Sequence, residues 1–125
     1  MTETVIDILN RLIAEGRNGR EHHVKVSRDF WEEPADAAEF TALDSVFRQE
    51  YGNLVEQVAQ AWGRPDFQGD GEAEGFPDWY DALELACWRR GEHIAYVAFQ
   101  HSDKELPMIV VLGAIPSAQA SAGAP

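Results

Sequence analysis

Residues 83–113, LELACWRRGEHIAYVAFQHSDKELPMIVVLG, decide the fold of this chain. The stretch contains three apolar segments, 83–89, 94–101 and 107–113, with the β-branched and aromatic residues typical of strands. Two short polar connections, residues 90–93 and 102–105, separate these segments. Connections this short join antiparallel neighbours, because a parallel pair needs a crossover of about a dozen residues or more. The stretch therefore predicts a three-stranded antiparallel meander.

Alternation of side chains along the predicted strands indicates how the two sheet faces are covered. In the first strand Cys87 points to one face and Trp88 to the other, and residues 108–112 are apolar on both faces. A sheet with one fully solvated face would alternate more cleanly between apolar and polar residues. Trp88, Val97 and Phe99 share a face that we expect the chain's own helices to cover. The alternative is that this face binds a partner or a second copy of the chain.

Two helical patterns precede the predicted sheet. Residues 2–15 carry apolar residues at three- and four-residue spacing, with Thr4 and Asp7 as a start signal and Gly16 as a stop, before a turn at residues 17–20. Residues 36–62 carry the strongest pattern, an apolar stripe made of Phe40, Leu43, Phe47, Tyr51, Leu54, Val58 and Trp62.

One helix over residues 36–62 would be roughly 40 Å long, which exceeds a compact domain of this size. Gly52 offers a break, and Asn53 with Glu56 three residues later resembles a helix start. We therefore predict two helices, 36–51 and 53–62, with a single kinked helix as the alternative.

The predicted fold class is α+β, with two to three N-terminal helices packed on a three-stranded antiparallel meander sheet. The sheet has four strands if the short alternating segment 23–27 pairs at its edge. Residues 1–115 form one domain in this prediction. Residues 116–125 are rich in alanine and serine and are expected to be a disordered tail.

The chain is strongly acidic, with 22 Asp and Glu against 10 Lys and Arg and a net charge of −12 in 125 residues. Such a charge repels nucleic acids and anionic membranes and suits a basic protein partner. Cys87 is the only cysteine, so no intramolecular disulfide can form. There is neither a secretory signal nor a run of about 18 apolar residues, so the expected location is cytoplasmic.

Catalytic and ligand-binding motifs are absent from the sequence. It has no phosphate-binding glycine loop, no nucleophile elbow and no paired zinc-ligand spacing, so we expect no catalytic residues, no metal and no cofactor. The alternative is a small-molecule-binding or enzymatic domain with its ligand between helices and sheet. Tyr96, His101 and Asp103 would then be the first residues to test.

The loop at residues 66–81 combines carboxylates with aromatic residues and contains no lysine or arginine. Acidic rims steer a basic partner and aromatic side chains anchor it. The candidate partner-binding residues are Asp66, Phe67, Asp70, Glu72, Glu74, Phe76, Asp78, Trp79 and Tyr80, together with Trp88 on the sheet. The alternative is that this loop docks its own aromatic side chains onto the core.

Three segments, AWGRPD at 61–66, ACWRRGE at 86–92 and HSDKELP at 101–107, resemble small bacterial immunity proteins of polymorphic-toxin systems. The resemblance spans residues 40–113 and rests on a helix stop and two hairpins. It implies a small cytosolic protein that neutralises one toxin by covering its active site or a neighbouring surface. It assigns no role to any single residue.

Overall fold

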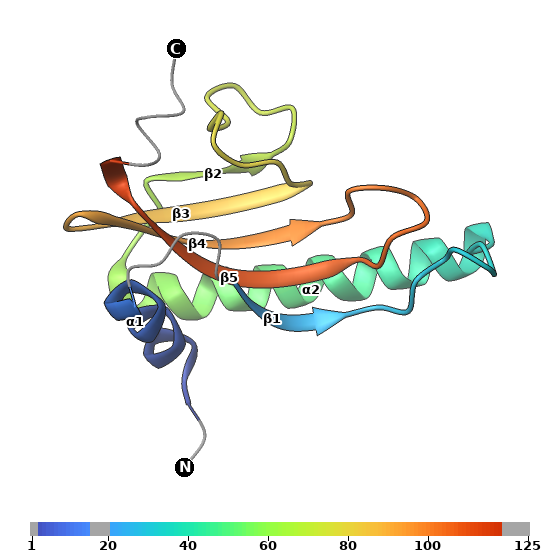
Figure 1. Cartoon of the computed structure of the whole chain (residues 1–125), viewed down its shortest axis with the longest axis horizontal. Helices are drawn as coiled ribbons and strands as arrows, with labels where there is room; N and C mark the ends of the chain where they lie inside the picture. The colour runs from blue at the N-terminus through green and yellow to red at the C-terminus, as the bar shows by residue number, and fades with distance from the viewer. Residues whose placement is uncertain (1–2, 16–20, 119–125) are drawn as a thin grey trace.

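The computed structural model describes residues 3–15 and 21–118, which form two helices and one five-stranded antiparallel sheet (Figure 1). The predicted α+β class is thus confirmed. The elements are α1 (Val5–Glu15), β1 (Glu21–Val26), α2 (Ala37–Trp62), β2 (Phe67–Asp70), β3 (Glu84–Arg90), β4 (His93–Gln100) and β5 (Ile109–Pro116).

The sheet has the strand order β1-β5-β4-β3-β2, with every neighbouring pair antiparallel. The predicted meander is present as β3, β4 and β5, and residues 23–26 of the predicted segment 23–27 belong to the edge strand β1. The strand β2 was not predicted, and the prediction of three or four strands is corrected to five. The four residues of β2 include a single apolar side chain, Phe67, so this strand depends on backbone pairing with β3. A Cβ at Gly69 would lie 2.6 Å from that of Ala73, so glycine is required there.

The helix α2 is continuous over 26 residues, so the predicted division at Gly52 is wrong. Its buried side chains lie on one face that packs against the sheet on both sides of Gly52 along the helix. They are Phe47, Tyr51, Leu54, Val55 and Val58. This continuous apolar contact outweighs the cost of one glycine, about 1 kcal/mol relative to alanine. Figure 1 shows the first turns of α2 extending past the ends of the strands.

The helix ends follow local rules. The Thr4 hydroxyl accepts from the Asp7 amide and the Asp7 carboxylate from the Thr4 amide, both at 3.1 Å, which confirms the predicted start of α1. Asp36 caps α2, and Gly63 ends it at φ 86°. The predicted stop at Gly16 and turn at 17–20 lie outside the described residues, as do residues 119–125 of the predicted tail. Strand β5 continues to Pro116, one residue past the predicted domain boundary.

Both faces of the sheet are covered by the chain itself. Helices α1 and α2 pack on one face, and residues 71–83, the β2–β3 loop, pack on the other. Trp88 lies under α2 with 2% of its surface exposed, and its indole Nε1 donates to the carbonyl of Gly63 at 2.8 Å. The interpretation that the helices cover this face is confirmed. Trp88 is therefore a core residue, which corrects its prediction as a partner-binding one.

Candidate protein-binding surface

The aromatic side chains of the predicted binding loop point into the protein. Phe67 and Phe76 meet edge to face at 5.7 Å between ring centroids, and Trp79 and Tyr80 stack around Tyr96 at 5.5 and 4.7 Å. All four loop rings are partly buried against the sheet. The loop therefore docks its own aromatic residues onto the core, as the alternative interpretation states.

Hydrogen bonds tie this loop to two strands. The hydroxyls of Tyr80 and Tyr96 both donate to the Glu21 carboxylate, at 2.5 and 2.7 Å, and the Gln100 amide donates to Tyr80. Burial raises the pKa of both tyrosines well above their ordinary value. The Tyr80 hydroxyl thus fixes the loop to β1 as a donor and to β4 as an acceptor.

The acidic residues that were predicted to bind a partner stay exposed: Asp66, Asp70, Glu72, Glu74 and Asp78. Two of them have local structural roles, since Asp66 accepts the Arg89 amide at 2.6 Å and Asp70 accepts the Glu72 amide at 2.9 Å. Within the described ranges, none of these five carboxylates forms an ion pair with a lysine or arginine. The segment presents charge to solvent without an aromatic anchor.

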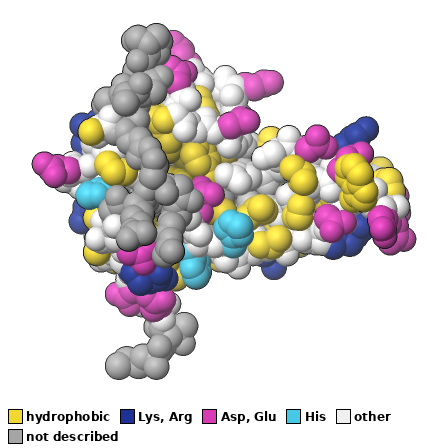
Figure 2. Space-filling model, viewed as in Figure 1, with side chains coloured by type: hydrophobic (Ala, Val, Ile, Leu, Met, Phe, Trp, Pro, Cys, Tyr) yellow, Lys and Arg dark blue, Asp and Glu magenta, His cyan; other side chains and the backbone are white. Residues whose placement is uncertain are grey.

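A second surface, which the sequence did not indicate, lies where α2 begins. Trp31 is 70% exposed, the highest value among the large hydrophobic residues described, and Phe40 is 42% exposed. A pocket of about 240 Å³ lies between them. We call its lining the Trp31 surface: Phe30, Trp31, Pro34, Ala35, Phe40, Lys104 and Glu105. Figure 2 shows hydrophobic and acidic side chains side by side at this end of the molecule.

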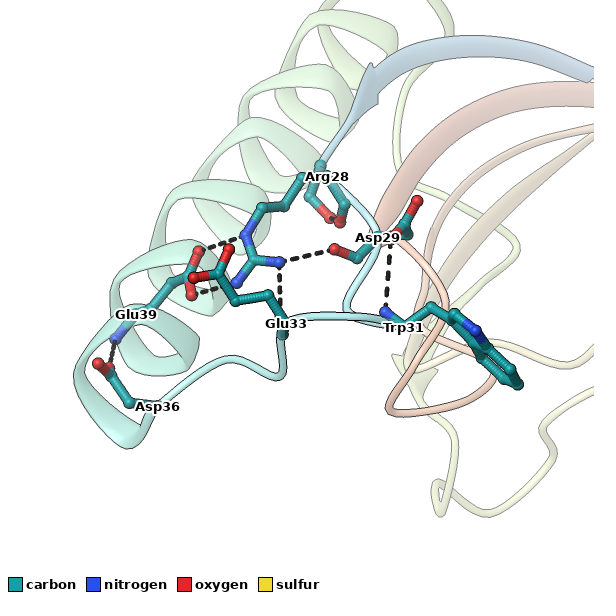
Figure 3. A network of polar contacts seen from close by, with 7 residues as sticks. Arg28, Asp29, Trp31, Glu33, Asp36 and Glu39 are labelled. Atoms are coloured by element: carbon teal, nitrogen blue, oxygen red, sulfur yellow. Dashed lines mark hydrogen bonds and ion pairs between the residues drawn. The ribbon is translucent and has the colours of Figure 1, made fainter.

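Arg28 holds the loop that carries Trp31 (Figure 3). Its guanidinium donates to the carbonyls of Asp29 and Glu33 at 2.8 and 2.7 Å, and to both carboxylate oxygens of Glu39 at 2.9 and 2.6 Å. The hydrogen bonds to Arg28 lower the pKa of the Glu39 carboxyl. The Asp29 carboxylate also accepts the Trp31 amide at 3.4 Å. Figure 3 shows the indole of Trp31 pointing away from this network.

The loop between β4 and β5, residues 101–108, holds the loop that carries Trp31, residues 27–36, from the other side. The Phe30 amide donates to the Glu105 carbonyl at 2.9 Å, and the Ser27 amide to the Met108 carbonyl at the same distance. The Met108 amide returns a bond to the Ser27 hydroxyl at 2.9 Å. Phe30 is 2% exposed, so it anchors the loop while its neighbour Trp31 stays in solvent. The exposed indole therefore stands on a backbone that is fixed at both sides.

The two segments that line the Trp31 surface are acidic in sequence. Residues 28–39 contain five Asp and Glu against one arginine, and that arginine is paired with Glu39. Residues 103–105 add two acids and Lys104. The sequence feature that could have drawn attention to this surface is the pair Phe30-Trp31 between a strand and a helix, followed by Glu32, Glu33 and Pro34. Nothing in that pattern says which of the two rings is buried.

The residues of the small-molecule alternative are not brought together. Tyr96 packs under the β2–β3 loop, whereas the ring of His101 contacts Phe30 and Phe40 at 5.9 Å each. The Asp103 carboxylate accepts the Glu105 amide at 3.1 Å in a local turn. A cavity of about 210 Å³ borders His101, whose Nε2 atom is buried without a hydrogen-bond partner in the described structure.

Residues 3–15 and 21–118 contain no group of three or more His, Cys, Asp or Glu side chains placed to hold a metal ion. In the same ranges, neither helix is long and apolar enough to cross a membrane. The chain matches no protein-family model, no curated protein and no solved structure.

Proposed function

We propose that this chain is a non-catalytic protein-binding domain, of the inhibitor or immunity type, that holds a basic protein partner at the Trp31 surface. One observation carries the proposal: the most exposed large aromatic side chain described stands on a backbone fixed by Arg28 and by the β4–β5 loop. Tryptophans are enriched among the residues that dominate binding energy at protein interfaces. A fixed loop also loses little conformational entropy when a partner binds.

The net charge of −12 supports a basic partner. A charge of this size raises the association rate of an oppositely charged protein and suppresses binding of acidic ones. The exposed carboxylates of the β2–β3 segment extend this field across a second part of the molecule. In the proposal, Asp66, Asp70, Glu72, Glu74 and Asp78 contribute steering, and Phe67, Phe76, Trp79 and Tyr80 hold their loop in place. Neutralisation of a cytoplasmic toxin is the form of this function that fits the resemblance to immunity proteins.

Co-expression with the products of neighbouring genes tests the proposal. We expect one basic product to form a stable complex, and its association rate to fall when the ionic strength is raised from low to physiological values. Replacing Glu72 and Glu74 by glutamine should lower the association rate and leave the dissociation rate nearly unchanged.

If no neighbouring product binds at either ionic strength, the proposal fails. A ligand that raises the melting temperature in a metabolite screen would favour the small-molecule alternative instead. Concentration-dependent sedimentation of the chain alone would favour a homodimer.

A further inference from the structure

We propose that the pocket of the Trp31 surface receives a single apolar side chain from a basic segment of the partner, with lysine or arginine residues on both sides of it. This inference rests on the proposed function and specifies how the partner is recognised. Three properties of the pocket support it: its size, the chemistry of its walls and the charge of its rim.

The size of the pocket fits a side chain. Its volume of about 240 Å³ lies below the range of about 300–1,000 Å³ typical of small-molecule sites. The pocket is also several times larger than the volume of about 30 Å³ that one water molecule occupies in the liquid. A leucine, isoleucine or methionine side chain from a protein is an occupant of the right scale.

Five of the seven residues that line the pocket are apolar, and the backbone that carries them is fixed. Trp31 and Phe40 expose ring surface, and Pro34 restricts the backbone between them. Phe30 forms the buried floor, and the Arg28 guanidinium lies 4.7 Å from the centre of its ring. An entering aliphatic group would remove aromatic surface from water without requiring the loop to rearrange.

The rim of the pocket selects the neighbours of that side chain. Asp29, Glu32, Glu33 and Asp36 lie on the same loop as Trp31, and the lining itself contains one acid, Glu105, and one base, Lys104. The segments that form the pocket are therefore acidic in balance. The guanidinium of Arg28 is engaged by Glu39 and by two carbonyls. Lysine or arginine residues flanking the apolar side chain would therefore meet carboxylates, whereas acidic neighbours would be repelled.

Three blocked peptides test the inference on the full chain: Lys-Lys-Leu-Lys-Lys, its alanine-centred analogue and Glu-Glu-Leu-Glu-Glu. The measurement is the shift of the Trp31 indole N–H signal by NMR during titration. We expect saturable binding of the leucine–lysine peptide, at least about ten-fold tighter than the alanine analogue, because a leucine buries more apolar surface. The acidic peptide should produce no saturable shift. Equal affinity of the leucine and alanine peptides, or binding of the acidic one, would overturn the inference.

Trp31→Ala and Val46→Ala provide matched variants. Both residues are exposed and apolar, at 70% and 49%, but Val46 is not part of the pocket lining. Neither residue belongs to the buried core, so both variants should fold like the wild type. Because Trp31→Ala lacks the indole signal, peptide binding to both variants is measured by isothermal titration calorimetry. We expect Trp31→Ala to abolish peptide binding and to weaken a partner complex about 30-fold or more, and Val46→Ala to change either by less than about two-fold.

The two proposals fail differently. A partner that binds wild type and Trp31→Ala equally well would refute the pocket and the placement of the partner at the Trp31 surface, and would leave only the protein-binding function standing. Absence of any partner, with a leucine–lysine peptide that still binds at Trp31, would refute the proposed function and leave the pocket chemistry intact.

Discussion

Replacing Gly52 by alanine should stabilise the protein, although the sequence pattern alone favours the opposite result. Gly52 lies in the middle of α2 on its exposed side, and a Cβ there would meet no described atom within 4 Å. Alanine therefore gains helix propensity and reduces the entropy of the unfolded chain, without a clash. If Gly52 instead ended one helix before a second one, it would be a position that favours glycine, and alanine would destabilise the protein.

The expected gain is about 0.5–1 kcal/mol in the free energy of unfolding. For a chain of this length that corresponds to a rise of about 2–4 °C in melting temperature. Gly63 is the matched control, because it ends the same helix at φ 86° and ψ −170°, a conformation that is essentially restricted to glycine. Gly63→Ala should cost about 1–3 kcal/mol.

Urea unfolding followed by circular dichroism at 222 nm measures both variants against the wild type. Opposite signs for the two substitutions are the expected result. A lower urea midpoint for Gly52→Ala, with an unchanged slope, would refute a continuous α2 and support the two-helix interpretation.

Further predictions concern the sheet and its titrating groups. A Cβ at Gly113 would collide with the ring of Tyr96, so Gly113→Ala should lower the free energy of unfolding by about 1–3 kcal/mol in urea. The double variant with Tyr96→Ala should lose less than the sum of the two single losses, and strict additivity would contradict the contact. Burial raises the pKa of Tyr51, Tyr80 and Tyr96 above their unfolded value of about 10. Their protonated hydroxyls therefore contribute fully to stability below a pH of about 10, and this contribution is lost as the pH rises further. The urea midpoint should therefore fall between about pH 8 and about pH 11, and a constant midpoint would count against it. Burial also raises the pKa of the Cys87 thiol to about 11, so a disulfide reagent at about pH 8 should label the native protein far more slowly than the unfolded one, and equal rates would show that the thiol is exposed.

The sheet could be predicted from the sequence because its main signals are local. The strands β3, β4 and β5 are apolar segments with β-branched and aromatic residues, and the links between them are too short for any parallel arrangement. Strand β2 could not be predicted, because Phe67–Asp70 has almost no apolar content and pairs only because β3 offers a free edge. The same limit applies to the binding loop: composition places acids and aromatics at residues 66–81, but only the packed structure separates buried rings from exposed carboxylates.

The error about α2 and the missed Trp31 surface have one physical cause. A helix of 26 residues is about 39 Å long, whereas a strand of eight residues spans about 26 Å, so α2 must extend beyond the sheet by about two turns. The apolar stripe of α2 continues into this overhang, and the strands cannot cover it. The ring of His101, just after β4, packs against Phe40 in this part of the helix, and Phe30 packs against the same histidine ring. They cover only part of the apolar surface, and the exposed portions of Trp31 and Phe40 remain.

A break at Gly52 would leave α2 no longer than the strands and remove the overhang. The length of α2 is therefore what creates the Trp31 surface, and a variant that breaks the helix at Gly52, such as Gly52→Pro, should lose binding there even though it alters no residue of the pocket.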